Sequence, residues 1–135
     1  MSCYNTGCQS YQKWFVGNDM RAILLADSAV TAQVGSNIYP CVASENTDGD
    51  FIVYSRQKYA KLDTKMGVYS DECEVAVVGI SDNYDRAIEL ASKIDNALTG
   101  YHIVGDNVRI KIELKDSTEV FDDNKYIETL LFSIK

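Results

Sequence analysis

The sequence predicts an α+β fold, in which helices pack on one face of a mainly antiparallel sheet. Three observations predict it. A long amphipathic helix is marked by apolar residues at helical spacing, namely Ala87, Ile88, Ala91, Ile94 and Leu98. Pairs of strand-like segments lie on either side of this helix, at 51–80 and 108–134. The chain has 135 residues and shows no internal repeat, low-complexity tract or linker, which is typical of one domain.

The N-terminal residues differ in composition from the rest of the chain. Residues 1–17 are predicted to form an arm that is polar apart from the apolar anchor Trp14-Phe15-Val16. Residues 18–135 are predicted to form the single α+β domain.

Two short helices are expected at the start of this domain. Asn18 is a suitable N-cap for the first, although a helix that begins near Ser10 and contains Gly17 is the alternative. Asp27-Ser28 offers a cap for the second helix, and Gly35 can end it. The apolar residues that recur at helical spacing are Met20, Ile23 and Leu24 in the first helix and Ala29, Val30 and Val34 in the second.

A short strand and a hairpin are expected next. Pro40 stops the strand Ile38-Tyr39, which places that strand at a sheet edge or makes this its end. The hairpin has strands at about 51–59 and 69–80, and the second is predicted to be central because Val75-Ala-Val-Val78 is apolar on both faces. Its charged residues suit either a mobile docking arm or a solvated loop: Lys58, Lys61, Asp63, Lys65 and Asp71.

The C-terminal part is predicted to hold the long helix and a second hairpin. Ser81 or Asp82 is the expected cap of the helix, and Gly100 its end. Residues 101–104 form a short extended piece, and residues 108–114 alternate as a half-buried strand. Turn residues at 116–118 and 122–124 precede a last strand at 126–134, with Leu130, Phe132 and Ile134 on one side and Ile127 and Leu131 on the other.

Charge and hydropathy exclude several function classes. The net charge of −7 and the pI of about 4.6 disfavour binding to a nucleic-acid backbone. No apolar run approaches the roughly 20 residues that cross a bilayer. The N-terminus lacks the basic and apolar regions of a signal peptide, so a cytoplasmic protein with reduced thiols is expected.

The sequence predicts no catalytic, cofactor or metal site. Its cysteines, Cys3, Cys8, Cys41 and Cys73, lack the close spacing of zinc ligands, and Cys73 is interpreted as a buried small hydrophobe. The single histidine, His102, is interpreted as a surface or half-buried residue. Asp48-Gly49-Asp50 and Asp122-Asp123 are interpreted as solvated turn acids.

Tyrosine is the one residue type that suggests a contact surface. Tyrosine joins apolar area to a polar tip and is enriched at protein interfaces, but it also decorates ordinary sheets, and both interpretations stay open. The tyrosines concerned are Tyr54, Tyr59, Tyr69, Tyr84, Tyr101 and Tyr126.

Several strings carry a resemblance to a known family. They are Arg21-Ala-Ile-Leu-Leu-Ala-Asp-Ser-Ala-Val-Thr-Ala-Gln-Val-Gly-Ser-Asn-Ile-Tyr-Pro40, then Phe51-Ile-Val-Tyr54, the helix of residues 85–98 and the strands at 108–114 and 126–134. In these the chain resembles, from about residue 18 to its end, the phage tail completion family of long-tailed phages and prophages, which is related to tail terminator and tail-to-head joining proteins.

The resemblance implies a tail-terminator-like α+β subunit without an active site. It implies a homo-hexameric ring that terminates the tail tube or joins it to the head, with the tail tube protein and the head–tail connector protein as partners. The virion tail, assembled in the bacterial host cytoplasm, is the implied location. No membrane contact and no nucleic-acid specificity are expected.

The residues leave other functions open. A small α+β ligand-binding or enzymatic domain is the alternative, and its first candidate residues are His102, Tyr101 and Asp106. A general interaction adaptor is a third hypothesis, which the sequence barely separates from a tail subunit.

Overall fold

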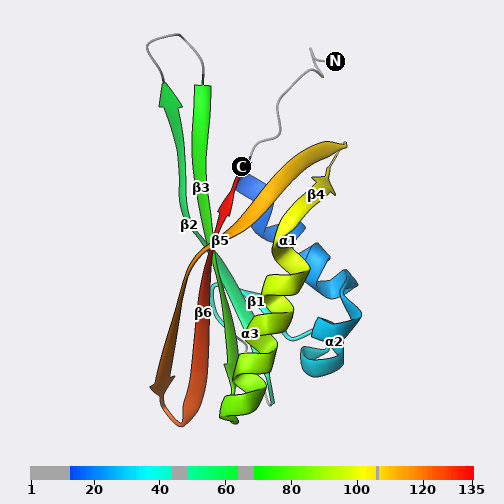
Figure 1. Cartoon of the computed structure of the whole chain (residues 1–135), viewed down its shortest axis with the longest axis vertical. Coiled ribbons are helices and arrows are strands. Elements are labelled where there is room, and N and C mark those ends of the chain that lie inside the picture. The colour runs from blue at the N-terminus through cyan, green and yellow to red at the C-terminus, as the bar shows by residue number, and fades with distance from the viewer. Residues whose placement is uncertain (1–12, 44–48, 64–68, 106) are drawn as a thin grey trace.

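The structure is a computed structural model that describes residues 13–43, 49–63, 69–105 and 107–135. Six strands form one sheet in the order β1-β2-β3-β6-β5-β4, in which β1 runs parallel to β2 and the other neighbours are antiparallel. The helices lie on one face of this sheet (Figure 1), which confirms the predicted α+β class. The strands are β1 Ile38–Pro40, β2 Phe51–Asp63, β3 Tyr69–Ser81, β4 Gly100–Val104, β5 Val108–Asp122 and β6 Lys125–Ile134.

The first helix begins earlier than the Asn18 cap predicts. A 3₁₀ turn at Lys13–Phe15 leads into α1 (Val16–Ala26), so Gly17 lies inside the helix, as in the alternative. Val16 is fully buried, and a Cβ on Gly17 would lie only 3.1 Å from Cε2 of Tyr54. The close approach of α1 to β2 therefore explains why Val16 is buried and why a glycine fits inside the helix. Residues 1–12 lie outside the described residues, and the extent of the N-terminal arm stays a prediction.

The second helix, α2 (Ser28–Val34), has the predicted ends. The Asp27 carboxylate accepts hydrogen bonds from the backbone N–H groups of Ala29 and Val30, and Gly35 closes the helix with a φ of 61°. The Arg21 guanidinium then donates to the carbonyl of Ile38 at 3.0 Å, which ties α1 to the edge strand β1.

The long helix, α3 (Tyr84–Leu98), differs from its prediction in cap and in face. Asn83, and not Ser81 or Asp82, is the N-cap, and its side chain accepts from the N–H of Arg86. Leu90 is fully buried, whereas Ile88 is 41% exposed. The buried face of the helix therefore includes Leu90 beside Ala87, and Ile88 lies outside it. Gly79 of β3 lies under this buried face and lets the helix approach the sheet.

Both hairpins are longer than predicted. The pairing of β2 with β3 continues to Asp63 and Tyr69, and the predicted Lys65 lies outside the described residues. The turn predicted at 116–118 is wrong, because β5 continues through it with a bulge between Leu114 and Asp116. The turn predicted at 122–124 is confirmed: the chain reverses at Asp123 and Asn124, whose positive φ angles of 50° and 60° are typical of a two-residue hairpin turn.

The core lies between the helices and one face of the sheet. Leu130, Phe132 and Ile134 point into it as predicted, together with Val75 and Val77 of the central strand β3. Ile127 and Leu131 alternate onto the opposite face, and no described element covers that face (Figure 1).

Candidate interaction surfaces

The sheet face opposite the helices carries a row of apolar side chains. Phe51, Ile80, Ile127 and Val120 are direct cross-strand neighbours on β2, β3, β6 and β5, and we call this row the apolar band. Val120 is 50% exposed, and the other three are half-buried. Contiguous apolar area without an intramolecular cover is typical of an interaction surface.

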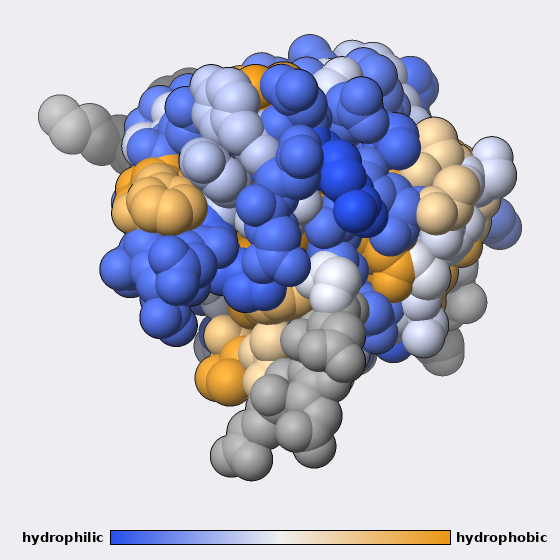
Figure 2. Space-filling model, turned by 90° about the horizontal axis from the view of Figure 1, so that it is seen from below, coloured by the Kyte–Doolittle hydropathy of each residue, from blue (hydrophilic) through white to orange (hydrophobic). Residues whose placement is uncertain are grey.

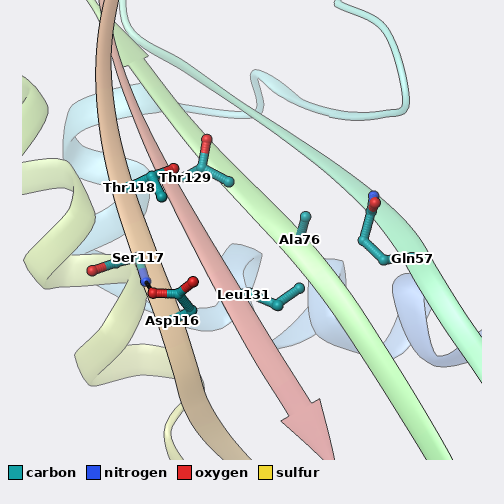
Figure 3. Close-up of a pocket in the computed structure, with 7 residues that line it drawn as sticks. All are labelled: Gln57, Ala76, Asp116, Ser117, Thr118, Thr129 and Leu131. Atoms are coloured by element: carbon teal, nitrogen blue, oxygen red, sulfur yellow. Dashed lines mark hydrogen bonds between the residues drawn. The ribbon is translucent and has the colours of Figure 1, made fainter.

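A shallow depression of about 190 Å³ lies beside the apolar band on the same face. Figure 3 shows the side chains of Asp116 and Thr118 on one side of β5 and that of Ser117 on the other. The Asp116 carboxylate accepts from the N–H of Ser117 at 2.8 Å. The lining mixes one acid with hydroxyl and aliphatic groups: Gln57, Ala76, Asp116, Ser117, Thr118, Thr129 and Leu131.

Beyond the depression this face becomes charged. Lys58 lies 2.5 Å from the Glu72 carboxylate, and Lys115 pairs with Glu74. The hydrogen bond between Lys58 and Glu72 raises the pKa of the lysine and lowers the pKa of the glutamate. The two long hairpins therefore carry polar pairs toward one end of the face and apolar side chains toward the other.

Among the described residues, two strands have edges that a neighbouring strand covers only in part. β1 pairs with β2 only at Ile52–Tyr54, and β4 pairs with β5 only at Val108–Ile112. We call residues 55–63 of β2 and 113–122 of β5 the free edges. They belong to hairpins that lie toward opposite ends of the sheet (Figure 1).

Exposed aromatic residues lie beside both free edges, on the helix side of the sheet. Trp14 is 55% exposed, and its ring lies 5.3 Å edge-on from that of Tyr59 and under the Arg56 guanidinium. Phe121 is 58% exposed and lies 4.7 Å from the ring of Tyr126. Figure 2 views the end of the molecule where the β5–β6 turn lies and shows apolar side chains in separate patches among hydrophilic ones.

The tyrosines do not share one environment. Tyr54 is buried in the core, whereas Tyr101 on β4 is exposed and stacks against the Arg109 guanidinium, 4.1 Å from the ring centre. Tyr84 donates to the Glu119 carboxylate at 3.0 Å. The side chain of Tyr69 lies outside the described part of the chain.

Two glutamates face each other near the end of the second hairpin. Glu119 and Glu128 are direct cross-strand neighbours, and Oε2 of Glu128 is buried with no partner among the described residues. Burial first, and then the hydrogen bond and charge of Glu119, raise the pKa of Glu128 to about 7.

This pair predicts that stability falls as pH rises. The pKa of Glu128 is about 7 in the folded chain, whereas its ordinary value is 4.5. The folded state therefore favours the protonated carboxyl, and the stability that this gives is fully present below pH 4.5 and is lost as pH rises through 7. We expect Glu128→Gln to stabilise the fold by about 1 kcal/mol at pH 8, discounted for solvent screening, and to change little at pH 4.5. Urea unfolding at both pH values measures this. The exposed Glu89→Gln is the matched control, and equal effects of both substitutions would contradict the prediction.

Asp50 is a buried carboxylate, so the interpretation of it as a solvated turn acid is wrong. It is 4% exposed and accepts from Ser81 Oγ at 2.7 Å and from Gln33 Nε2 at 2.6 Å. The Arg86 guanidinium lies 3.0 Å away. The cluster joins α2, the start of β2, the end of β3 and α3. Asp48 lies outside the described residues, whereas Asp122 and Asp123 are exposed, as predicted.

The two described candidate residues of the ligand-binding alternative, His102 and Tyr101, lie on opposite faces of the sheet. His102 is half-buried, as predicted, and its Nε2 lies 2.7 Å from the carbonyl oxygen of Leu98. Tyr101 is its neighbour on β4 and therefore points to the other face of the sheet. Asp106 lies outside the described residues.

The remaining candidates are cysteines and acids. Cys73 is buried as predicted, and Cys41 is exposed; neither forms a disulfide in the described part of the chain, which does not include Cys3 and Cys8. Within the described ranges, no three His, Cys, Asp or Glu side chains are grouped as metal ligands. No helix there combines the length and apolarity that a bilayer crossing requires.

The fold has a counterpart among solved structures. No protein-family model and no curated protein matches the chain. A chain of the virion of a native gene transfer agent particle superimposes with a TM-score of 0.73 at 19% identity, over 85% of this chain and 89% of that one. The two chains therefore share the same fold over nearly their whole lengths.

Proposed function

We propose that the chain is a structural subunit of a virion tail. The observation that carries this is the likeness to a chain of a gene transfer agent virion, which extends over 85% of this chain. The resemblance of residues 18–135 to the tail completion family points the same way.

The finer role that we propose is a ring, a homo-hexamer, that terminates the tail tube or joins it to the head. Its partners would be further copies of the chain, the tail tube protein and the head–tail connector protein, and it would assemble in the cytoplasm of a bacterial host. Subunits of a ring contact each other through two different patches. The free edges of β2 and β5 supply two such patches on one molecule.

We further propose that the chain catalyses no reaction. His102 supports this, because its ring nitrogen is engaged by a helix-end carbonyl. Replacement of His102 by alanine is expected to leave phage assembly intact in a complementation assay. Loss of assembly by a variant that still folds would instead favour a ligand or catalytic role for this residue.

Self-association tests the ring. Sedimentation velocity over a wide concentration range should show a transition from monomer to one larger species of fixed size, and negative-stain microscopy should show that species as closed rings. Because association can require the tube, a series with purified tail tubes belongs to the experiment. A chain that stays monomeric throughout and does not bind tubes would contradict the proposal.

A further inference from the structure

Strands β2 and β5 present free edges of opposite charge. Residues 55–63 on β2 include three bases and one acid, whereas residues 113–122 on β5 include four acids and one base. An open strand edge is a template for pairing with another chain. Two β2 edges, or two β5 edges, would repel each other because their charges have the same sign, whereas a β2 edge and a β5 edge attract each other.

The strand directions suit such a pairing. β2 and β5 run antiparallel within one chain, because the pairs β2–β3, β3–β6 and β6–β5 are all antiparallel. Two copies in similar orientation therefore place β2 of one antiparallel to β5 of the next.

The faces of the side chains select a register. We call the sheet face opposite the helices the open face. Lys58 lies opposite Glu74 on this face, and Asp122 shares the face with Val120. Tyr59 lies opposite the buried Cys73, and Phe121 lies one residue from Asp122, so both are on the helix side. Directly opposed residues must share a face.

One register satisfies this rule and also matches the chemistry. With Lys58 opposite Asp122, the lysine, which lies 2.5 Å from Glu72 within its own chain, faces a second carboxylate on the open face. Ala60 meets Val120 on that face. On the helix side Tyr59 meets Phe121. Trp14 lies 5.3 Å from Tyr59 within one copy, so the exposed aromatic residues beside both edges would join in one cluster.

We propose that the partner of the β2 free edge is the β5 free edge of a second copy of this chain, in the register Lys58–Asp122, Tyr59–Phe121 and Ala60–Val120. The contact is heterologous and makes the sheet continuous from copy to copy. This inference rests on the proposed function in that repeated use of the contact builds the ring.

Cysteine cross-linking of separate variants tests the register. Ala60→Cys and Val120→Cys are made in a background in which Cys3, Cys8 and Cys41 are serine, and the two proteins are mixed under mild oxidation. Opposed residues of paired strands lie close enough for a disulfide. The mixture should yield at least about tenfold more cross-linked dimer than either variant alone, since pairing raises the effective thiol concentration.

Control variants separate the edge contact from association in general. Ile88→Cys on α3 is 41% exposed and lies on the helix side of the sheet, whereas Ala60 and Val120 lie on the opposite face, so it should not cross-link to Ala60→Cys. Asp122→Lys should lower the yield of the Ala60–Val120 product, and Lys58→Glu in the partner should restore it.

The outcomes distinguish this inference from the proposed function. If rings form but the mixture of Ala60→Cys and Val120→Cys yields no more cross-linked dimer than the single variants or the Ile88→Cys control, the edge pairing is overturned and the proposed ring stands. A chain that neither cross-links nor associates, with or without tail tubes, would overturn both.

Discussion

Gly79→Val is expected to destabilise the fold by about 3 kcal/mol, because the helix α3 lies directly on this glycine. A Cβ at position 79 would be 3.1 Å from Cγ and Cδ2 of Leu90 and 3.3 Å from Cδ1 of Ile94. Valine adds two methyl groups to that space, so α3 must move away from the sheet or Leu90 must leave its rotamer. Urea unfolding followed by circular dichroism measures the loss.

The effect of the smaller substitution Gly79→Ala on stability, measured with and without Leu90, tests whether the contact with Leu90 is responsible. Gly79→Ala alone should destabilise the fold by about 1 kcal/mol. In a Leu90→Ala background the same methyl group enters the cavity left by the leucine, and Gly79→Ala should there be neutral or stabilising. Equal losses in both backgrounds would mean that crowding against Leu90 is not the cause.

Asp50→Ala is expected to cost about 3 kcal/mol of unfolding free energy, because it breaks a buried charged cluster on one side only. Ser81 Oγ and Gln33 Nε2 both lose their acceptor, and Ser81 is almost fully buried. Arg86 keeps its exposed position and can be solvated, so Arg86→Ala should cost less than Asp50→Ala.

The matched control for Asp50 is an acid that is exposed in a turn. Asp123 has a φ of 50°, which asparagine also tolerates, so Asp123→Asn should change stability by less than about 0.5 kcal/mol. Asp50→Asn keeps the shape of the side chain and should fall between the two. Similar small values for Asp50→Ala and Asp123→Asn would contradict the buried network.

Local patterns predicted most of the elements but not always which side of an element is buried. The stripe through Ala87, Ile94 and Leu98 is correct, yet both Ile88 and Leu90 lie beside it on the helical wheel. The choice depends on where the sheet lies under the helix. That packing is not encoded within the helix itself.

Longer-range contacts explain the other differences. The string Asp116-Ser-Thr118 has turn composition, but pairing with β6 keeps it extended, and a bulge accommodates the extra residue. Asp50 looks like a turn acid because its partners, Gln33, Ser81 and Arg86, are distant in sequence. By contrast, the apolar residues on both faces of β3 and β6 were visible in the sequence, and one of those faces is the uncovered one.

We propose that copies of this chain form a ring that terminates the tail tube or joins it to the head. The most direct measurement adds the purified chain to tail tube protein during polymerisation and follows tube length and tube ends by negative-stain microscopy. We expect shorter tubes that carry a ring of this chain at one end, identified by a label on the chain. Tubes of unchanged length, with no label at either end, would contradict it.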